Sequence, residues 1–149
     1  MKSSLSYELT REVMATADTF LRESQRLFRP HGLTAAQYNV LNVLADAVDG
    51  LSQRELGDIL VVDRSNITGL LDRLEKSGLV KRSDHPSDRR VYRVSLTPVG
   101  RKLWIKVDAL YRKVVVQVTA ELSEKQARDS IVALKLLQTG AALWRLPEK

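Results

Sequence analysis

The sequence of 149 residues contains no cysteine and only two histidines, His31 and His85. Without cysteine the chain has no disulfide, no cysteine-ligated zinc or iron–sulfur site, and no thiol for catalysis or redox sensing. Two histidines are also too few for a histidine-rich metal site. The composition therefore argues against cysteine- or histidine-based metal sites, and we expect no metal and no cofactor.

Long hydrophobic runs are missing as well. Two of the longest unbroken apolar runs, Ile59–Val62 and Ala141–Trp144, each cover a single helical turn, whereas a membrane span needs roughly 20 apolar residues. The N-terminal sequence MKSSLSYELT lacks the apolar segment of a signal peptide. We therefore expect a cytoplasmic protein without a membrane partner.

Aromatic residues are few, at 5% of the chain, but the hydrophobic fraction of 44% is ordinary for a globular protein. A chain of this length is long enough to build one hydrophobic core. The sequence therefore fits one domain, or one small lobe with helical extensions.

Positive charge is concentrated in one part of the chain. The formal net charge is +6, and residues 73–102 contain nine basic and three acidic residues, so the remainder is neutral. The nine basic residues are Arg73, Lys76, Lys81, Arg82, Arg89, Arg90, Arg93, Arg101 and Lys102. Such a run is often only a solvated face, but its confinement to one stretch favours a surface that faces phosphates.

Hydrophobic spacing predicts a mainly helical (α+β) chain. Capping boxes, in which a Ser or Thr and the Glu or Gln three residues later bond each other's backbone amides, start helices at Thr34, Ser52 and Ser123. Turn residues separate two strand-like runs. The predicted elements are helices over 5–28, 34–49, 52–60 and 63–76, strands over 79–83 and 91–96, and helices over 97–122 and 123–146.

The helices over 52–60 and 63–76 have the arrangement of a helix-turn-helix, whose second helix enters the major groove of DNA. Short polar side chains at its start suit base contacts, because an asparagine can pair with adenine through two hydrogen bonds. The alternative is that they only cap and decorate an exposed helix. The candidate DNA contacts are Arg64, Ser65, Asn66, Thr68 and Arg73, with supporting contacts from Ser52, Gln53 and Arg54.

The two strands predict a hairpin whose tip carries Asp88, Arg89 and Arg90. A guanidinium suits the narrow minor groove, where negative potential is concentrated, and Asp88 can orient Arg90 through an ion pair. The alternative is a solvated turn with a weak surface ion pair. Gly69 lies inside the helix over 63–76, where glycine weakens a helix, and the sequence leaves open whether it admits DNA or a neighbouring helix.

Four motifs in register resemble one family of regulators. They are Gly32-Leu33-Thr34 with Tyr38-Asn39-Val40-Leu41, Leu51–Leu56 (LSQREL), Leu71–Val80 (LDRLEKSGLV), and Asp88–Thr97 (DRRVYRVSLT), which fits D-x-R-x5-L-T. Together with the order of the helices, they make nearly the whole chain similar to the MarR family.

This resemblance implies a homodimeric winged helix-turn-helix transcription factor, often a repressor, that binds a pseudo-palindromic operator in double-stranded DNA. The helix Asp63–Lys76 would read the major groove, and the tip with Asp88, Arg89 and Arg90 would enter the minor groove. Because cysteine is absent, the family's thiol-oxidation switch is excluded. The expected divisions are an N-terminal dimerisation helix and linker (1–33), a winged helix-turn-helix domain with a two-stranded wing (34–100), and C-terminal dimerisation helices (101–149).

The terminal helices carry more apolar surface than one small winged domain can cover. A two-fold axis would bring the two ends of the chain together as partners, since symmetric dimers dominate among soluble homo-oligomers. The alternative is that these residues pack on their own chain. The residues are Leu5, Leu9 and Val13 at one end and Ile131, Leu134 and Leu137 at the other.

The resemblance also implies release of DNA by a small ligand bound between the dimer helices and the winged lobe. Arg22 or Arg26 is available for an anionic aromatic ligand. Residues of these types are more often ordinary core or surface than ligand contacts, so that remains the alternative for each candidate. The candidates are Phe20, His31, Tyr38, Trp104 and Tyr111.

Other classes of function find little support. The chain has no G-x-S-x-G, P-loop or G-x-G-x-x-G motif and no cluster of His with Asp and Glu, so we predict that it is not an enzyme. A membrane-surface role is weak because the basic residues lie on a hairpin and not on an amphipathic helix. The remaining alternative is a constitutive or architectural DNA-binding protein without a ligand.

Overall fold

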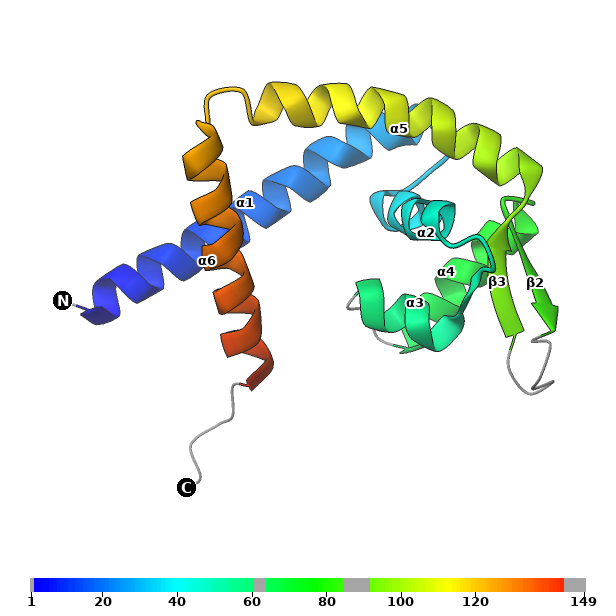
Figure 1. Ribbon diagram of the computed structural model, residues 1–149, viewed down its shortest axis with the longest axis horizontal. Coiled ribbons are helices and arrows are strands. Elements are labelled where there is room, and N and C mark those ends of the chain that lie inside the picture. Colours follow the sequence, from blue (N-terminus) through cyan, green and yellow to red (C-terminus); the bar gives the residue numbers. More distant parts are fainter. Residues whose placement is uncertain (1, 61–63, 85–91, 144–149) are drawn as a thin grey trace. The chain divides into compact units, whose positions relative to one another are not determined.

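The computed structural model describes residues 2–60, 64–84 and 92–143 (Figure 1). The chain forms two compact units, residues 1–111 and 112–149, and the boundary falls inside one long helix. The elements in chain order are α1 (Lys2–Phe28), the 3-10 helix η1 (Arg29–His31), α2 (Ala35–Asp46), β1 (Leu51–Ser52), α3 (Gln53–Leu60), α4 (Arg64–Lys76), β2 (Val80–Asp84), β3 (Tyr92–Leu96), α5 (Pro98–Val118) and α6 (Glu124–Leu143).

The mainly helical class and the hairpin are confirmed, with one addition. The sheet has three antiparallel strands in the order β1-β3-β2, because Leu51 and Ser52 pair with Val94 and Arg93. The sequence predicts only β2 and β3, since a strand of two residues has no periodicity. The sequence also places the end of α2 too late: the helix ends at Asp46 and not at 49.

The predicted capping boxes are confirmed in all three helices. At α2 the Gln37 amide donates to Thr34 Oγ1 (3.1 Å) and the Thr34 amide to Gln37 Oε1 (2.8 Å). Ser52 with Glu55 and Ser123 with Gln126 form the same reciprocal pairs at α3 and α6.

One hydrophobic core joins the end of α1, α2, α3, α4, the sheet and α5 within the first unit. Its centre is an aromatic cluster in which the Phe28 and Tyr38 rings stack at 4.4 Å and Tyr111 lies 5.1 Å from Tyr38. The buried Tyr38 hydroxyl donates to Asp108 Oδ1 at 2.8 Å. The buried members are Phe28, Leu33, Tyr38, Val40, Leu41, Leu44, Leu56, Ile67, Leu70, Leu71, Leu74, Leu79, Val80, Val94 and Val107.

The start of α5 is fixed against the end of α4 by a close backbone approach. Thr97 Oγ1 donates to the Gly78 carbonyl (2.6 Å) and accepts from the Gly100 amide (3.0 Å). A Cβ on Gly100 would lie 1.9 Å from the Leu79 carbonyl oxygen, so only glycine fits there. Gly78 follows the end of α4 and has a φ of +68°, a left-handed conformation that is common just after a helix.

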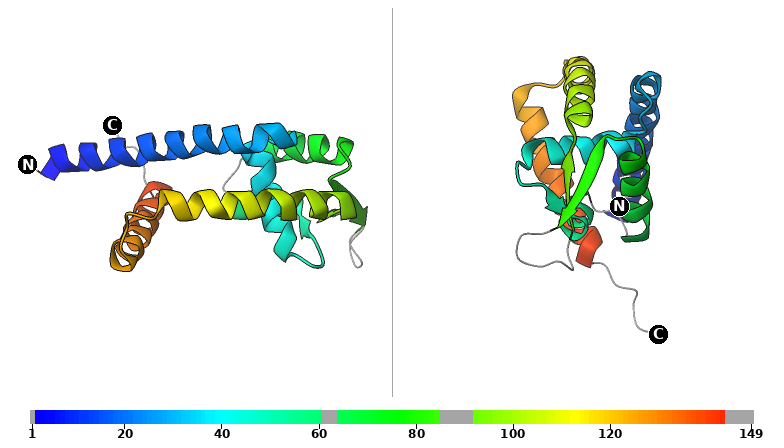
Figure 2. Two further views of the ribbon diagram at one scale, coloured as in Figure 1. Left: turned by 90° about the horizontal axis from the view of Figure 1, so that it is seen from above. Right: turned by 90° about the vertical axis from the view of Figure 1, so that its right-hand side faces the viewer.

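Most of α1 extends beyond the core. Figure 2 shows this helix running away from the lobe formed by α2, α3, α4 and the sheet. Its first part exposes Leu5 (67%) and Leu9 (47%), and its core members lie at its end. In the second unit, α6 exposes Ile131 and Leu134. Within the described part of the chain, no helix combines the length and hydropathy needed to cross a membrane.

Candidate nucleic-acid interface

Helices α3 and α4 hold each other in the arrangement of a helix-turn-helix. Leu56 of α3 and Ile67 of α4 are fully buried in the core, and Gln53 Nε2 at the start of α3 donates to Thr68 Oγ1 on α4. The apolar residues of α4, Ile67, Leu70, Leu71 and Leu74, are buried in the core, so the opposite side of the helix faces solvent. This exposed side is the surface with which a helix-turn-helix meets the major groove.

The structure describes three of the five predicted recognition side chains. Asn66, Thr68 and Arg73 are exposed along α4, and Thr68 is bound to Gln53. Arg64 and Ser65 belong to the first turn of α4. The three wing residues Asp88, Arg89 and Arg90 lie outside the described residues.

The supporting residues at the start of α3 have structural partners. Ser52 Oγ accepts from the Glu55 amide (3.2 Å), and the exposed Arg54 lies 3.9 Å from Asp58 Oδ2. Ser52 therefore caps the helix, Gln53 joins it to α4, and Arg54 has only a weak exposed pair. Arg54 is the only charged residue of the three, and its exposed guanidinium remains available to a partner.

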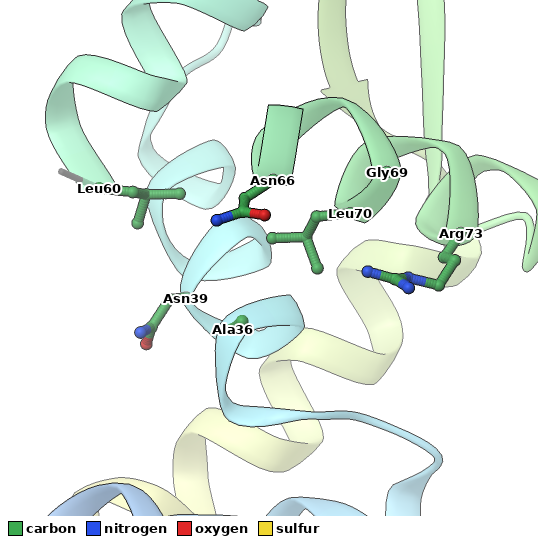
Figure 3. A pocket seen from close by; sticks show the side chains of 7 residues that line it. All are labelled: Ala36, Asn39, Leu60, Asn66, Gly69, Leu70 and Arg73. Atoms are coloured by element: carbon green, nitrogen blue, oxygen red, sulfur yellow. The ribbon is translucent and has the colours of Figure 1, made fainter. Parts of the chain in front are cut away.

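A hollow of about 400 Å³ lies between α2 and α4. In Figure 3, Asn66 and Arg73 reach over it from α4 with Leu70 between them, while Ala36 and Asn39 lie across from them on α2. Its lining residues are Ala36, Asn39, Leu60, Asn66, Gly69, Leu70 and Arg73. Sequence reasoning missed Asn39, because no local signal links a residue of α2 to the exposed flank of α4.

Two arginines of the basic stretch donate hydrogen bonds to backbone carbonyls within the chain. Arg93 donates to the carbonyls of Asp49 and Gly50, both at 2.9 Å. Arg101 donates to the Ala45 carbonyl at 3.3 Å. These arginines join the sheet and α5 to the end of α2, a role that long-range contacts create and composition does not reveal.

Arg82 on β2 is bound to two carboxylates of α4. Its guanidinium donates to Asp72 Oδ1 (2.6 Å) and to Glu75 Oε2, and its backbone amide donates to Glu75 Oε1 (3.1 Å). Burial lowers the pKa of Arg82, but the hydrogen bonds to Asp72 and Glu75 outweigh it and raise the pKa above its ordinary value. Arg82 thus joins β2 of the wing to α4 through ion pairs with Asp72 and Glu75, an arrangement that we call the charged fork. Within residues 73–102, the described basic residues that are exposed are Arg73, Lys76, Lys81, Arg101 and Lys102.

The five residues expected to line a ligand pocket are placed differently from one another. Tyr38 is buried in the aromatic cluster, and Tyr111 packs against it. Trp104 Nε1 donates to Asn42 Oδ1 at 3.2 Å. Phe20 is 47% exposed on α1, and His31 is half-buried in η1. The seven residues that line the hollow at α4 are a different set.

The paired helices α3 and α4, followed by an antiparallel hairpin and flanked by long helices, define a winged helix-turn-helix DNA-binding protein. Residues 31–91 match the sequence model of the MarR family. The HTH-type transcriptional regulator TtmR of Methylorubrum extorquens (strain PA1) is 40% identical over 133 residues, which are 89% of this chain and 68% of that protein. The chain belongs to the MarR family.

Two further relatives agree with this membership. The homoprotocatechuate degradative operon repressor of Escherichia coli is 32% identical over 102 residues, which cover 63% of this chain and 68% of the repressor. A crystal structure of a cysteine-to-serine mutant of MarR from E. coli, complexed with operator DNA, has a TM-score of 0.80 and 27% identity, and covers 87% of this chain and 93% of that one. The chain is therefore a DNA-binding regulator of transcription and not an enzyme.

Proposed function

We propose that this regulator is a repressor that binds a pseudo-palindromic operator as a homodimer and is released by a small, anionic aromatic ligand. The observation that carries the proposal is the exposed side of α4, where Asn66 and Arg73 face solvent on a helix fixed by its buried stripe. An asparagine suits adenine, and an arginine suits guanine or a phosphate. The operator in the E. coli MarR crystal structure and the repressor among the relatives support this choice.

The wing completes the proposed contact. Asp88, Arg89 and Arg90 follow β2, and the fork between Arg82 and the two carboxylates of α4 fixes the root of the hairpin relative to α4. We propose that the arginines enter the minor groove beside the half-site that α4 reads. Replacing Arg90 by Ala is expected to weaken binding to most sequences.

The proposed dimer rests on exposed apolar surface in both units. Large apolar side chains remain exposed at the start of α1, in the last turns of α5 and along α6. A two-fold dimer would cover such surface and would present two α4 helices to half-sites about 34–36 Å apart. The exposed residues that support it include Leu5, Leu9, Val114, Val118, Ile131 and Leu134.

Deletion of residues 1–15 tests the dimer, because the core members of α1 lie at its other end and the winged lobe keeps its core. We expect the truncated chain to lose both dimerisation, measured by light scattering, and specific DNA binding. A truncated chain that remains a monomer and still binds one operator tightly would contradict the proposed dimer.

Selection from random DNA with the full chain tests operator recognition. We expect an enriched inverted repeat, bound about 10³-fold or more tightly than scrambled DNA. DNA binding without any enriched repeat would favour the architectural alternative, in which affinity comes only from phosphates.

The same selection repeated with aromatic carboxylates tests the proposed ligand. We expect one such compound to weaken operator binding, through a site around Phe20, His31, Tyr38, Trp104 and Tyr111. Operator binding that no compound of this class changes would favour a constitutive DNA-binding protein. The relative named for repression of a homoprotocatechuate degradative operon supports the choice of compound class.

A further inference from the structure

Gly69 is a glycine that the chain's own fold does not require. The φ angle of Gly69 is not positive, and a Cβ added to this residue would meet nothing within 4 Å. Gly100 is the opposite case, since a Cβ there would collide with the Leu79 carbonyl. Gly50 likewise has a φ of +70° and a backbone neighbour 2.5 Å from its ideal Cβ. The described residues thus explain Gly50 and Gly100 but not Gly69.

The position of Gly69 matters because nothing in the described structure requires a glycine there. It lies in the interior of the 13-residue helix α4, where alanine would give a more stable helix. Asn66 and Arg73 stand on either side of it along the exposed flank, and Figure 3 shows all three beside the same hollow. Among the described residues, no atom of a neighbouring helix lies within 4 Å of a Cβ built on Gly69, so close packing of a helix does not explain the glycine.

The side chains around Gly69 are held in place by partners within the chain. Thr68, the preceding residue, is bound to Gln53, and Asp72, one turn later, is bound to Arg82. Gly69, which is half-buried, therefore lies among side chains of fixed position and carries no side chain of its own.

An α-helix with its side chains is about 10–12 Å wide, and the major groove is about 12 Å wide, so the fit is tight. A helix approaches the base pairs more closely where it carries no side chain. The short side chain of Asn66 reaches base edges only if the backbone beside it is close to them. A bare backbone next to Asn66 meets this requirement.

We propose that Gly69 is a specificity-determining residue, at which the backbone of α4 approaches the base-pair edges in the major groove. This inference rests on the proposed function. Because Gly69 has no side chain, the α4 backbone can lie close to the base-pair edges. At this short distance the side chains of Asn66 and Arg73 reach the DNA. Any side chain at position 69 pushes the helix outward and weakens these contacts.

The test compares Gly69→Ala and Gly69→Leu with the wild type and with a control, Gly140→Ala. Gly140 is also a helical glycine whose ideal Cβ meets nothing within 4 Å, but it lies in α6. Each full-length variant is measured by thermal unfolding, by light scattering, and by binding to the selected operator and to scrambled DNA.

We expect Gly69→Ala to raise the Tm by about 2–4 °C, as a glycine-to-alanine change does in an exposed helix interior. Its affinity for the operator should fall about tenfold, and that of Gly69→Leu should fall further because its side chain is larger. Binding to scrambled DNA, which depends on phosphates, should change by less than about threefold. Gly140→Ala should leave the ratio of the two affinities unchanged, because α6 lies outside the proposed DNA contacts, and light scattering reports any effect on the proposed dimer separately.

The result that overturns the inference is a Gly69→Ala variant that binds the operator as tightly as the wild type. An equal loss on operator and scrambled DNA would also overturn it, because the clash would then involve phosphates and not bases. A fall in Tm would show that the fold itself needs this glycine. If the wild type enriches no operator, the proposed function fails first and this inference fails with it.

Discussion

Replacing Arg82 by Gln tests whether this arginine serves the fold or the DNA. The sequence places it among nine clustered basic residues, which favours a contact with phosphate. In the structure its guanidinium joins β2 to Asp72 and Glu75 of α4, and its side chain is only 23% exposed. The substitution removes the charge and leaves a shorter polar side chain.

The expected loss of stability follows from the exposure of the two partners. The Asp72 side chain is 58% exposed, so its pair with Arg82 contributes about 0.5 kcal/mol after solvent screening. The Glu75 side chain is 39% exposed, and its charge-assisted hydrogen bond contributes about 1 kcal/mol. We therefore expect Arg82→Gln to lower the free energy of unfolding in urea by about 1–2 kcal/mol.

Salt dependence distinguishes this role from a phosphate contact. Each phosphate contact contributes about 0.9 to the slope of log K against log salt concentration, and we expect Arg82→Gln to leave that slope unchanged. Lys81→Gln is the matched control: the neighbouring residue on β2 is exposed, so its loss should change stability by less than about 0.5 kcal/mol. A slope reduced by about 1, with unfolding unchanged, would refute the intramolecular role of Arg82.

Three further substitutions test the core, the close backbone approach and the recognition helix. Tyr38→Phe should lower the free energy of unfolding by about 1.5–3 kcal/mol, measured in urea, because buried Asp108 loses its hydroxyl donor; an unchanged value would contradict this. Gly100→Ala should destabilise the fold by about 1–3 kcal/mol, seen as a lower Tm, because its Cβ would clash with the Leu79 carbonyl. Asn66→Ala should relax preference at one base position in each half-site. Equal losses on operator and scrambled DNA would remove Asn66 from base recognition.

Helix boundaries set by local chemistry were predictable from the sequence. The capping pairs at Thr34, Ser52 and Ser123 are confirmed because each needs only residues three positions apart. The strand β1 was not predictable, because two residues become a strand only by pairing with β3, more than forty residues later. Likewise α2 ends at Asp46, a few residues before the turn that the sequence takes as its end.

The candidate site divides in a similar way. The face of α4 that carries Asn66 and Arg73 follows from the apolar spacing of the same helix. Local spacing does not predict the hydrogen bond between Gln53 and Thr68, because these residues belong to different helices. For the same reason it does not predict that Asn39 of α2 lies across the hollow from α4.

The sequence by itself determined the order of elements, the helix starts, the face of α4 that turns to solvent, and the resemblance to the MarR family. These depend on spacing and on contacts within a few residues, which the chain carries locally. Only the tertiary structure decided which basic side chains have partners within the chain. Arg82, Arg93 and Arg101 are bound to groups distant in sequence, because folding brings acceptors to them that composition cannot reveal. The tertiary structure also separated the glycines that the fold needs from Gly69, because the space around a backbone exists only once its neighbours are in place.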